Sequence, residues 1–173
     1  MKHESDKLNE VKVLDSNITF EQIYKSEYFP IELEEELKKC DVLLIPTLVE
    51  RNEDEHYVFP EQTMNFYDYA KGFLEKEHIS ADICISDKDY KEFELHSIVE
   101  TIATIIVNNV AFPFTINMIS SYLYEKITNR NNINKKIKVN FEVVDGKKAK
   151  KIAYEGDASS FKETMEAIKI FEE

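Results

Sequence analysis

The stretch of sequence that decides the fold is HSIVETIATIIVNNVAFPFTINMISSYLYEKI, residues 96–127, in which no charged side chain lies between Glu100 and Glu125. Its apolar residues recur at helical spacing on both sides of Pro113. Because proline lacks an N–H and its ring clashes with the preceding turn, we expect two helices in tandem with a break near residues 111–114. Both halves are apolar nearly all the way round, so we predict a central helical hairpin that is covered on several sides.

The same stretch is long enough to form a membrane-spanning helix. Residues 101–124 supply 24 uncharged positions, and roughly 20 are needed to cross a bilayer. Asparagine, threonine and serine side chains within them would need partners in hydrocarbon, where polar groups are costly. No signal peptide precedes the acidic N-terminal part. We therefore expect a cytoplasmic protein with a buried core, and keep a membrane-associated accessory protein anchored through 101–124 as the alternative.

The chain length of 173 residues predicts one domain. We assign residues 1–15 to a flexible N-terminal segment, because they are mostly polar and charged, and residues 16–173 to a single α/β domain. The two cysteines, Cys40 and Cys84, are far apart and have no metal-ligand spacing, so we expect reduced, buried thiols. We predict no metal and no cofactor.

Charge is divided unevenly along a chain whose net charge is -12. Residues 1–125 hold 11 basic and 26 acidic side chains, whereas residues 126–151 hold 9 basic and 2 acidic ones. An acidic chain repels nucleic acid at long range, and Tyr154 is the only aromatic residue placed to stack on a base near the basic segment. Nucleic-acid binding is therefore disfavoured, and we expect an acidic protein surface as the partner of the basic segment, including that of a second copy.

The first half of the chain has the pattern of a βαβ unit. A capping box at residues 19–22 and Pro30 each predict the start of a short helix. The apolar run 42–45 predicts a buried strand, a helical pattern follows through Phe66, and residues 79–86 predict a second strand. Strand, helix and strand in this order predict a parallel pair.

Between the first strand and its helix we expect a polar loop over residues 47–60. In α/β proteins ligands bind beyond the carboxyl ends of the strands, which is where this loop lies. It has four carboxylates and no glycine-rich turn, so a phosphate would be repelled and poorly wrapped. We predict contact with another protein for this loop.

Residues 82–86 and 91–96 predict a hairpin, because apolar residues alternate in both. Pairing in register places Asp82 opposite His96 and beside Cys84. A thiol, an imidazole and a carboxylate on one face are the parts of a nucleophilic site. Half-solvated sheets normally have a polar face, however, so we predict no catalytic residue and keep an enzyme that uses this face as a further alternative.

The C-terminal part predicts a ββα unit. Residues 135–144 alternate strictly between apolar and polar, Asp145-Gly146 suits a type I′ turn, and residues 148–154 return as the partner strand before Gly156. A capping box at residues 160–163 then begins a final helix. We therefore predict an α/β fold: a mixed sheet with a βαβ unit, the central apolar helical hairpin and this ββα unit.

Three segments carry a resemblance: ADICISDKDYKEFELHS (81–97), NNVAFPFTINMISSYLYEKI (108–127) and IAYEGD (152–157). Together they resemble a group of small uncharacterised bacterial proteins associated with mobile or antiphage defence loci. The resemblance covers about half of the chain. It implies a subunit or regulator within a bacterial defence or toxin-related system, and it implies no catalytic residues.

From these observations we predict a non-enzymatic protein-binding or assembly subunit that forms a homo-oligomer. The tandem helices have more apolar surface than one small domain can cover, and such a patch usually marks an interface. The basic segment would meet an acidic surface of the next copy. The predicted interface comprises Phe112, Phe114, Met118, Tyr122, Tyr124, Lys136, Lys138, Lys148 and Lys150.

Overall fold

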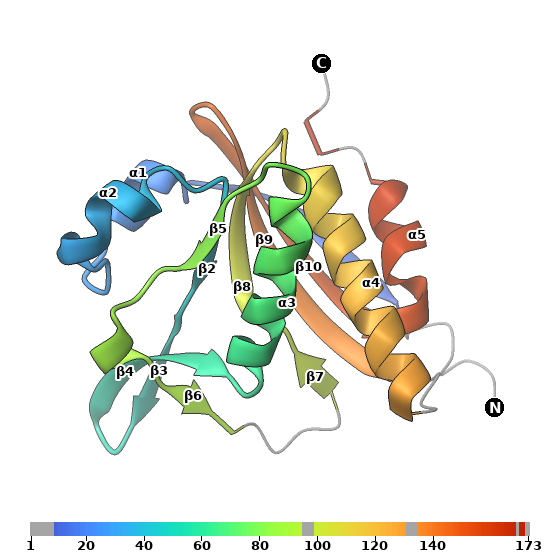
Figure 1. The fold of residues 1–173 in the computed structure, drawn as a ribbon, viewed down its shortest axis with the longest axis horizontal. Coiled ribbons are helices and arrows are strands. Elements are labelled where there is room, and N and C mark those ends of the chain that lie inside the picture. The colour runs from blue at the N-terminus through green and yellow to red at the C-terminus, as the bar shows by residue number, and fades with distance from the viewer. Residues whose placement is uncertain (1–8, 95–98, 131–134, 169, 172–173) are drawn as a thin grey trace.

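The computed structural model describes residues 9–94, 99–130, 135–168 and 170–171, and its centre is a mixed sheet (Figure 1). The strand order is β1-β10-β9-β8-β2-β5. Strand β7 pairs with the first residues of β9, and β8 pairs with residues farther along the same strand. The predicted α/β class with a mixed sheet is confirmed. The strands are β1 (Glu10–Ser16), β2 (Val42–Ile45), β5 (Ala81–Ile83), β7 (Val99–Thr101), β8 (Thr104–Asn108), β9 (Lys136–Asp145) and β10 (Lys148–Asp157).

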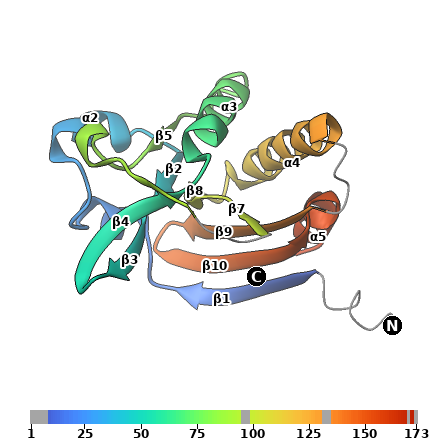
Figure 2. The same ribbon diagram turned by 90° about the horizontal axis from the view of Figure 1, so that it is seen from below.

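Helices lie on both faces of this sheet (Figures 1 and 2). One face, here the helical face, packs against α3, α4 and α5. The opposite face, here the open face, packs against α1 and α2 near β2, β8 and the adjoining ends of β9 and β10. Side chains alternate between the two cores, so Ile105 lies in the first and Ile106 in the second. The helices are α1 (Phe20–Tyr24), α2 (Glu34–Leu37), α3 (Thr63–Glu75), α4 (Phe112–Arg130) and α5 (Phe161–Glu166).

The predicted pair of tandem helices is wrong, because the first half of the decisive stretch forms β7 and β8 and only α4 is helical. Pro113 lies in the first turn of α4, where its missing N–H is not needed. Before this turn the Asn108 Oδ1 atom accepts a hydrogen bond of 2.8 Å from the Ala111 N–H. Strand β8 is buried on both faces, so it shows no alternation, and its β-branched residues favour an extended backbone.

The βαβ prediction is confirmed in β2, α3 and β5. Strand β2 is buried throughout and pairs in parallel with β5. Strand β5 covers only Ala81–Ile83 of the expected residues 79–86. Of the capping box predicted at residues 19–22, the threonine half forms: the Thr19 hydroxyl accepts a hydrogen bond from the Gln22 N–H at the start of α1.

Two local predictions in this half are wrong. Residues 47–60 form a hairpin of β3 (Thr47–Arg51) and β4 (Asp54–Pro60), whose tip residues Asn52 and Glu53 have φ of 53° and 69°, as a type I′ turn requires. Within the described residues, β5 pairs with no later hairpin strand. The chain instead passes through a 3₁₀ turn (Asp87–Asp89) to β6 (Glu92–Phe93), which pairs in parallel with β4.

The C-terminal ββα unit is confirmed, with three differences in detail. The turn between β9 and β10 has Gly146 and Lys147 at its centre and only Gly146 has a positive φ, of 64°, which fits type II′ and not type I′. Strand β10 continues through Gly156 to Asp157. No side-chain cap forms at Ser160, and a 3₁₀ turn (Ala158–Ser160) leads into α5.

The expected boundary between a flexible segment 1–15 and a domain beginning at residue 16 falls inside β1. This strand pairs with β10 along its whole length, from Glu10 opposite Glu155 to Ser16 opposite Ala149. Residues 10–15 therefore lie in the sheet, and residues 1–8 lie outside the described residues.

A partly buried ion cluster ties β7 to α4 and to the residue before β9. The Glu100 carboxylate lies 2.5 Å from Lys126 Nζ and 3.0 Å from Lys135 Nζ, and its side chain is 17 % exposed. Burial raises the pKa of Glu100, but the hydrogen bonds and charges of the two lysines outweigh it and hold the pKa below its usual range. The ionised carboxylate therefore stabilises the fold at neutral pH.

Glu100→Gln should lower the free energy of unfolding by about 1–3 kcal/mol at pH 7, between the values for exposed and buried pairs. A carboxyl with a lowered folded pKa contributes stability above its usual pKa and loses it as pH falls. The difference in the free energy of unfolding between Glu100→Gln and wild type should therefore disappear below the usual pKa of 4.5. Urea unfolding across pH tests this. Glu34→Gln, which breaks the exposed Glu34–Lys38 pair, is the control and should cost less than about 0.5 kcal/mol.

Candidate functional site

Strand β1 is the outermost strand on one side of the main sheet (Figure 2). It pairs with β10 on its inner side, and in the described part of the chain no strand pairs with its outer side. Five of its seven residues are exposed. A row of backbone groups therefore faces outward along this edge.

Two hydrogen bonds show which backbone groups these are. The Asp157 N–H of β10 donates to Asn9 Oδ1 at 2.8 Å on the β1 side, and the Val144 carbonyl of β9 accepts from the Asn109 N–H at 2.8 Å on the β8 side. Backbone groups alternate between the two sides of a strand from one residue to the next. The odd-numbered residues of β10 therefore face β1.

The register of β1 with β10 then gives the outward groups. The residues opposite the odd-numbered residues of β10 are Glu10, Lys12, Leu14 and Ser16, and their backbone groups are used within the sheet. The N–H and C=O groups that face outward are those of Val11, Val13 and Asp15.

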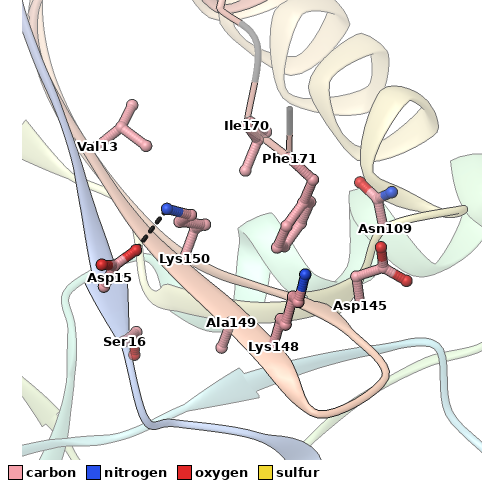
Figure 3. Close-up of a pocket in the computed structure, with 10 residues that line it drawn as sticks. All are labelled: Val13, Asp15, Ser16, Asn109, Asp145, Lys148, Ala149, Lys150, Ile170 and Phe171. Atoms are coloured by element: carbon pink, nitrogen blue, oxygen red, sulfur yellow. Dashed lines mark hydrogen bonds and ion pairs between the residues drawn. The ribbon is translucent and has the colours of Figure 1, made fainter. Parts of the chain in front are cut away.

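A hollow of about 1020 Å³ lies beside this edge on the helical face (Figure 3). Strands β1 and β10 form one wall, and the segment after α5 forms another. Asp15 forms an ion pair with Lys150, and the hydrogen bond and charge of Lys150 lower the pKa of the Asp15 carboxyl. The hollow on the helical face is lined by Val13, Asp15, Ser16, Asn109, Asp145, Lys148, Ala149, Lys150, Ile170 and Phe171.

A second hollow, of about 310 Å³, lies beside the same edge on the open face. Leu14 lines it and is 56 % exposed. Because side chains alternate along a strand, a strand added at β1 would place alternate side chains beside each hollow. The hollow on the open face is lined by Glu10, Lys12, Leu14, Lys138, Asn140, Lys151, Ala153, Tyr154 and Glu155.

The end of β1 is fixed by a buried carboxyl on the open face. The Ser16 hydroxyl donates a hydrogen bond of 2.7 Å to Glu142 Oε1, and Glu142 is 7 % exposed. Burial raises the pKa of Glu142 above its usual range, although the Ser16 hydrogen bond and the charge of Lys151 oppose this. Glu142 thus holds β1 in place, at an electrostatic cost.

The predicted apolar patch on α4 does not form. Phe112, Met118 and Tyr122 are only 5 %, 0 % and 8 % exposed, so they belong to the core. Phe114 and Tyr124 are exposed, but ten residues separate them, which is about 15 Å along a helix. The error follows from placing two helices where the structure has one helix packed on a sheet.

The four predicted interface lysines do not lie on one face of the sheet. Lys136 and Lys138 lie on the open face, whereas Lys148 and Lys150 lie on the helical face. Lys136 is ion-paired with Asp157. The β1 edge has Lys138 beside one hollow and Lys148 and Lys150 beside the other, so these three predicted residues lie at the site.

Strand β1 itself is not among the predicted elements. Its alternating Val11, Lys12, Val13 and Leu14 were a signal for a strand. Flanking charges led us to place these residues in the flexible segment.

The Asp82, Cys84 and His96 face lacks the properties of a nucleophilic site. Cys84 is fully buried, and burial raises the pKa of its thiol to about 12. Burial also raises the pKa of Cys40 to about 11, so both thiols stay protonated at neutral pH. Asp82 accepts a hydrogen bond of 3.3 Å from the Tyr67 hydroxyl. His96 lies outside the described residues.

Among the described residues, no three histidine, cysteine, aspartate or glutamate side chains are grouped so that they could hold a metal ion. The helices of the described part include none with the length and apolar character needed to cross a bilayer.

Comparisons of the chain with protein-family models, with curated proteins and with solved structures found no match.

Glu142→Gln should raise the free energy of unfolding by about 0.5–1.5 kcal/mol at pH 7, because a neutral amide can still accept the Ser16 hydrogen bond and costs less to bury. A carboxyl with a raised folded pKa destabilises the fold when ionised, and this penalty disappears as pH falls through the folded pKa. The difference in the free energy of unfolding between Glu142→Gln and wild type should therefore disappear at acidic pH.

Thermal or urea unfolding across pH measures this difference. Glu155→Gln, an exposed carboxyl on the same face, is the control and should change stability by less than about 0.5 kcal/mol. A less stable Glu142→Gln variant at pH 7 would show that the ionised carboxylate is favourable where it lies.

Proposed function

We propose that this protein is a non-enzymatic protein-binding or assembly subunit that takes up an extended strand of its partner at β1. The observation that carries the proposal is the outward row of backbone groups of Val11, Val13 and Asp15 on an edge with a hollow on each face. In strand addition the backbone hydrogen bonds supply affinity, and pockets for alternate side chains supply specificity.

The character of the edge supports this proposal. Proteins usually blunt an exposed edge with prolines, bulges, charges or a very short strand. Strand β1 has seven residues in continuous register with β10 and contains no proline, although Glu10, Lys12 and Asp15 are charged. Three outward residues offer up to six backbone hydrogen bonds, each worth about 0.5–1.5 kcal/mol net.

Other classes of function have less support. The protonated, buried thiol of Cys84 argues against a cysteine nucleophile. The lysines of β9 and β10 are divided between two faces, and Lys136 and Lys150 are ion-paired, which argues against a nucleic-acid surface. We place the subunit in the cytoplasm, since both cysteines are unpaired, and in a bacterial defence or toxin-related system on the resemblance alone.

Two substitutions at one position test strand addition. Val13→Pro removes an outward N–H that pairs with no strand in the described part of the chain, and proline is tolerated on an edge strand in this orientation. Val13→Thr is the matched control, because it keeps the N–H and the β-branched shape. Proteins that co-purify with the tagged chain from cells that encode it should be lost with Val13→Pro and kept with Val13→Thr.

Melting curves of both variants check that each is folded. Equal recovery of the co-purifying proteins with a folded Val13→Pro variant would contradict binding at the edge.

A further inference from the structure

The strand that fits the β1 edge is β1 itself. We propose that two copies of the chain join edge to edge, with their β1 strands antiparallel about a two-fold axis at Val13, so that two sheets become one continuous sheet. This inference rests on the proposed function, because it uses the same edge, and it names the partner as a second copy.

The register follows from the outward groups. With the axis at Val13, each Val13 exchanges two hydrogen bonds with Val13 of the second copy, and each Val11 faces Asp15 of the other. Lys12 then lies opposite Leu14 of the second copy, and Glu10 opposite Ser16. All seven residues overlap, and no like charges face each other directly. An axis at Lys12 would place two lysines opposite each other, which is destabilising.

Pairing in this register would cover the apolar side chains that β1 leaves at the surface. Val13 is 37 % exposed and Leu14 is 56 % exposed. On the helical face the two Val13 side chains would meet at the axis. On the open face the aliphatic stem of Lys12 would lie against Leu14 of the second copy.

The local charge also suits a second copy. Two chains of net charge -12 repel each other in general. At this edge, however, the charges are nearly balanced, because the two hollows are lined by five lysines and four carboxylates. The lysines are Lys12, Lys138, Lys148, Lys150 and Lys151, and the carboxylates are those of Glu10, Asp15, Asp145 and Glu155. Two copies can therefore approach here without strong like-charge repulsion.

Sedimentation of the full chain tests the association. Wild type and Val13→Thr should form a dimer at both about 0.15 M and about 1 M salt, since backbone hydrogen bonds and apolar contacts are little screened. Val13→Pro removes two inter-chain hydrogen bonds at the axis and should raise the dissociation constant at least about thirtyfold. A dimer that is unchanged in folded Val13→Pro would overturn the proposal.

Cysteine cross-linking tests the register and does not depend on the proline variant. Val13→Cys places two thiols opposite each other at the axis, within the Cα separation that a disulfide spans. Mild oxidation should give a covalent dimer of Val13→Cys. The Leu14→Cys variant should give much less covalent dimer under the same oxidation. Wild type, with its native Cys40 and Cys84, should give no covalent dimer above background. Preferential cross-linking of Leu14→Cys would overturn the axis at Val13.

The outcomes also separate this inference from the proposed function. A wild-type chain that is monomeric at every concentration and both salts ends self-pairing. If that monomer still loses its co-purifying proteins in Val13→Pro, strand addition stands and the partner is a different chain. If it keeps them, both proposals fail.

Discussion

The alternation of backbone and side-chain directions along β9 and β10 is the constraint on which the rest of the structure depends. Each of these strands has ten residues. Their side chains alternate between the core under α3, α4 and α5 and the open face, where only Val144 and Ala149 reach the core under α1 and α2. A shift of one residue would therefore turn the apolar side chains of both strands away from the main core. The backbone groups alternate in the same strands, and this alternation determines which groups of β1 face outward.

An edge strand can bind a partner strongly only if it is already ordered, because ordering it on binding would cost conformational entropy. Strand β1 is held at three places. Near its start Asn9 accepts the Asp157 N–H, near its end Asp15 pairs with Lys150, and at its last residue Ser16 bonds to Glu142. All three contacts point toward the sheet, so they order the strand without using its outward groups.

Sequence reasoning worked where one face of an element is polar or where both ends of an element carry turn signals. The strict alternation of residues 135–144 and the buried run 42–45 predicted β9 and β2 correctly. The prediction from sequence failed for β8, because an apolar strand covered on both faces has the composition of a buried helix. The edge at β1 was beyond sequence reasoning for a different reason: which strand is outermost depends on the order of pairing, and nothing local in residues 10–16 specifies that order.

The charge division along the sequence changes its meaning once the chain is folded. Residues 126–151 hold the excess of lysines, which in the sequence suggested a basic surface for an acidic partner. In the fold four of these lysines bind carboxylates of the same chain: Lys126 and Lys135 bind Glu100, Lys136 binds Asp157, and Lys150 binds Asp15. All three carboxylates lie outside the basic segment, on strands that pair directly with β9 or β10. The complementary charges therefore act first between neighbouring strands, and what β1 leaves for a partner is its outward backbone groups, flanked by apolar side chains and by a nearly balanced set of charges.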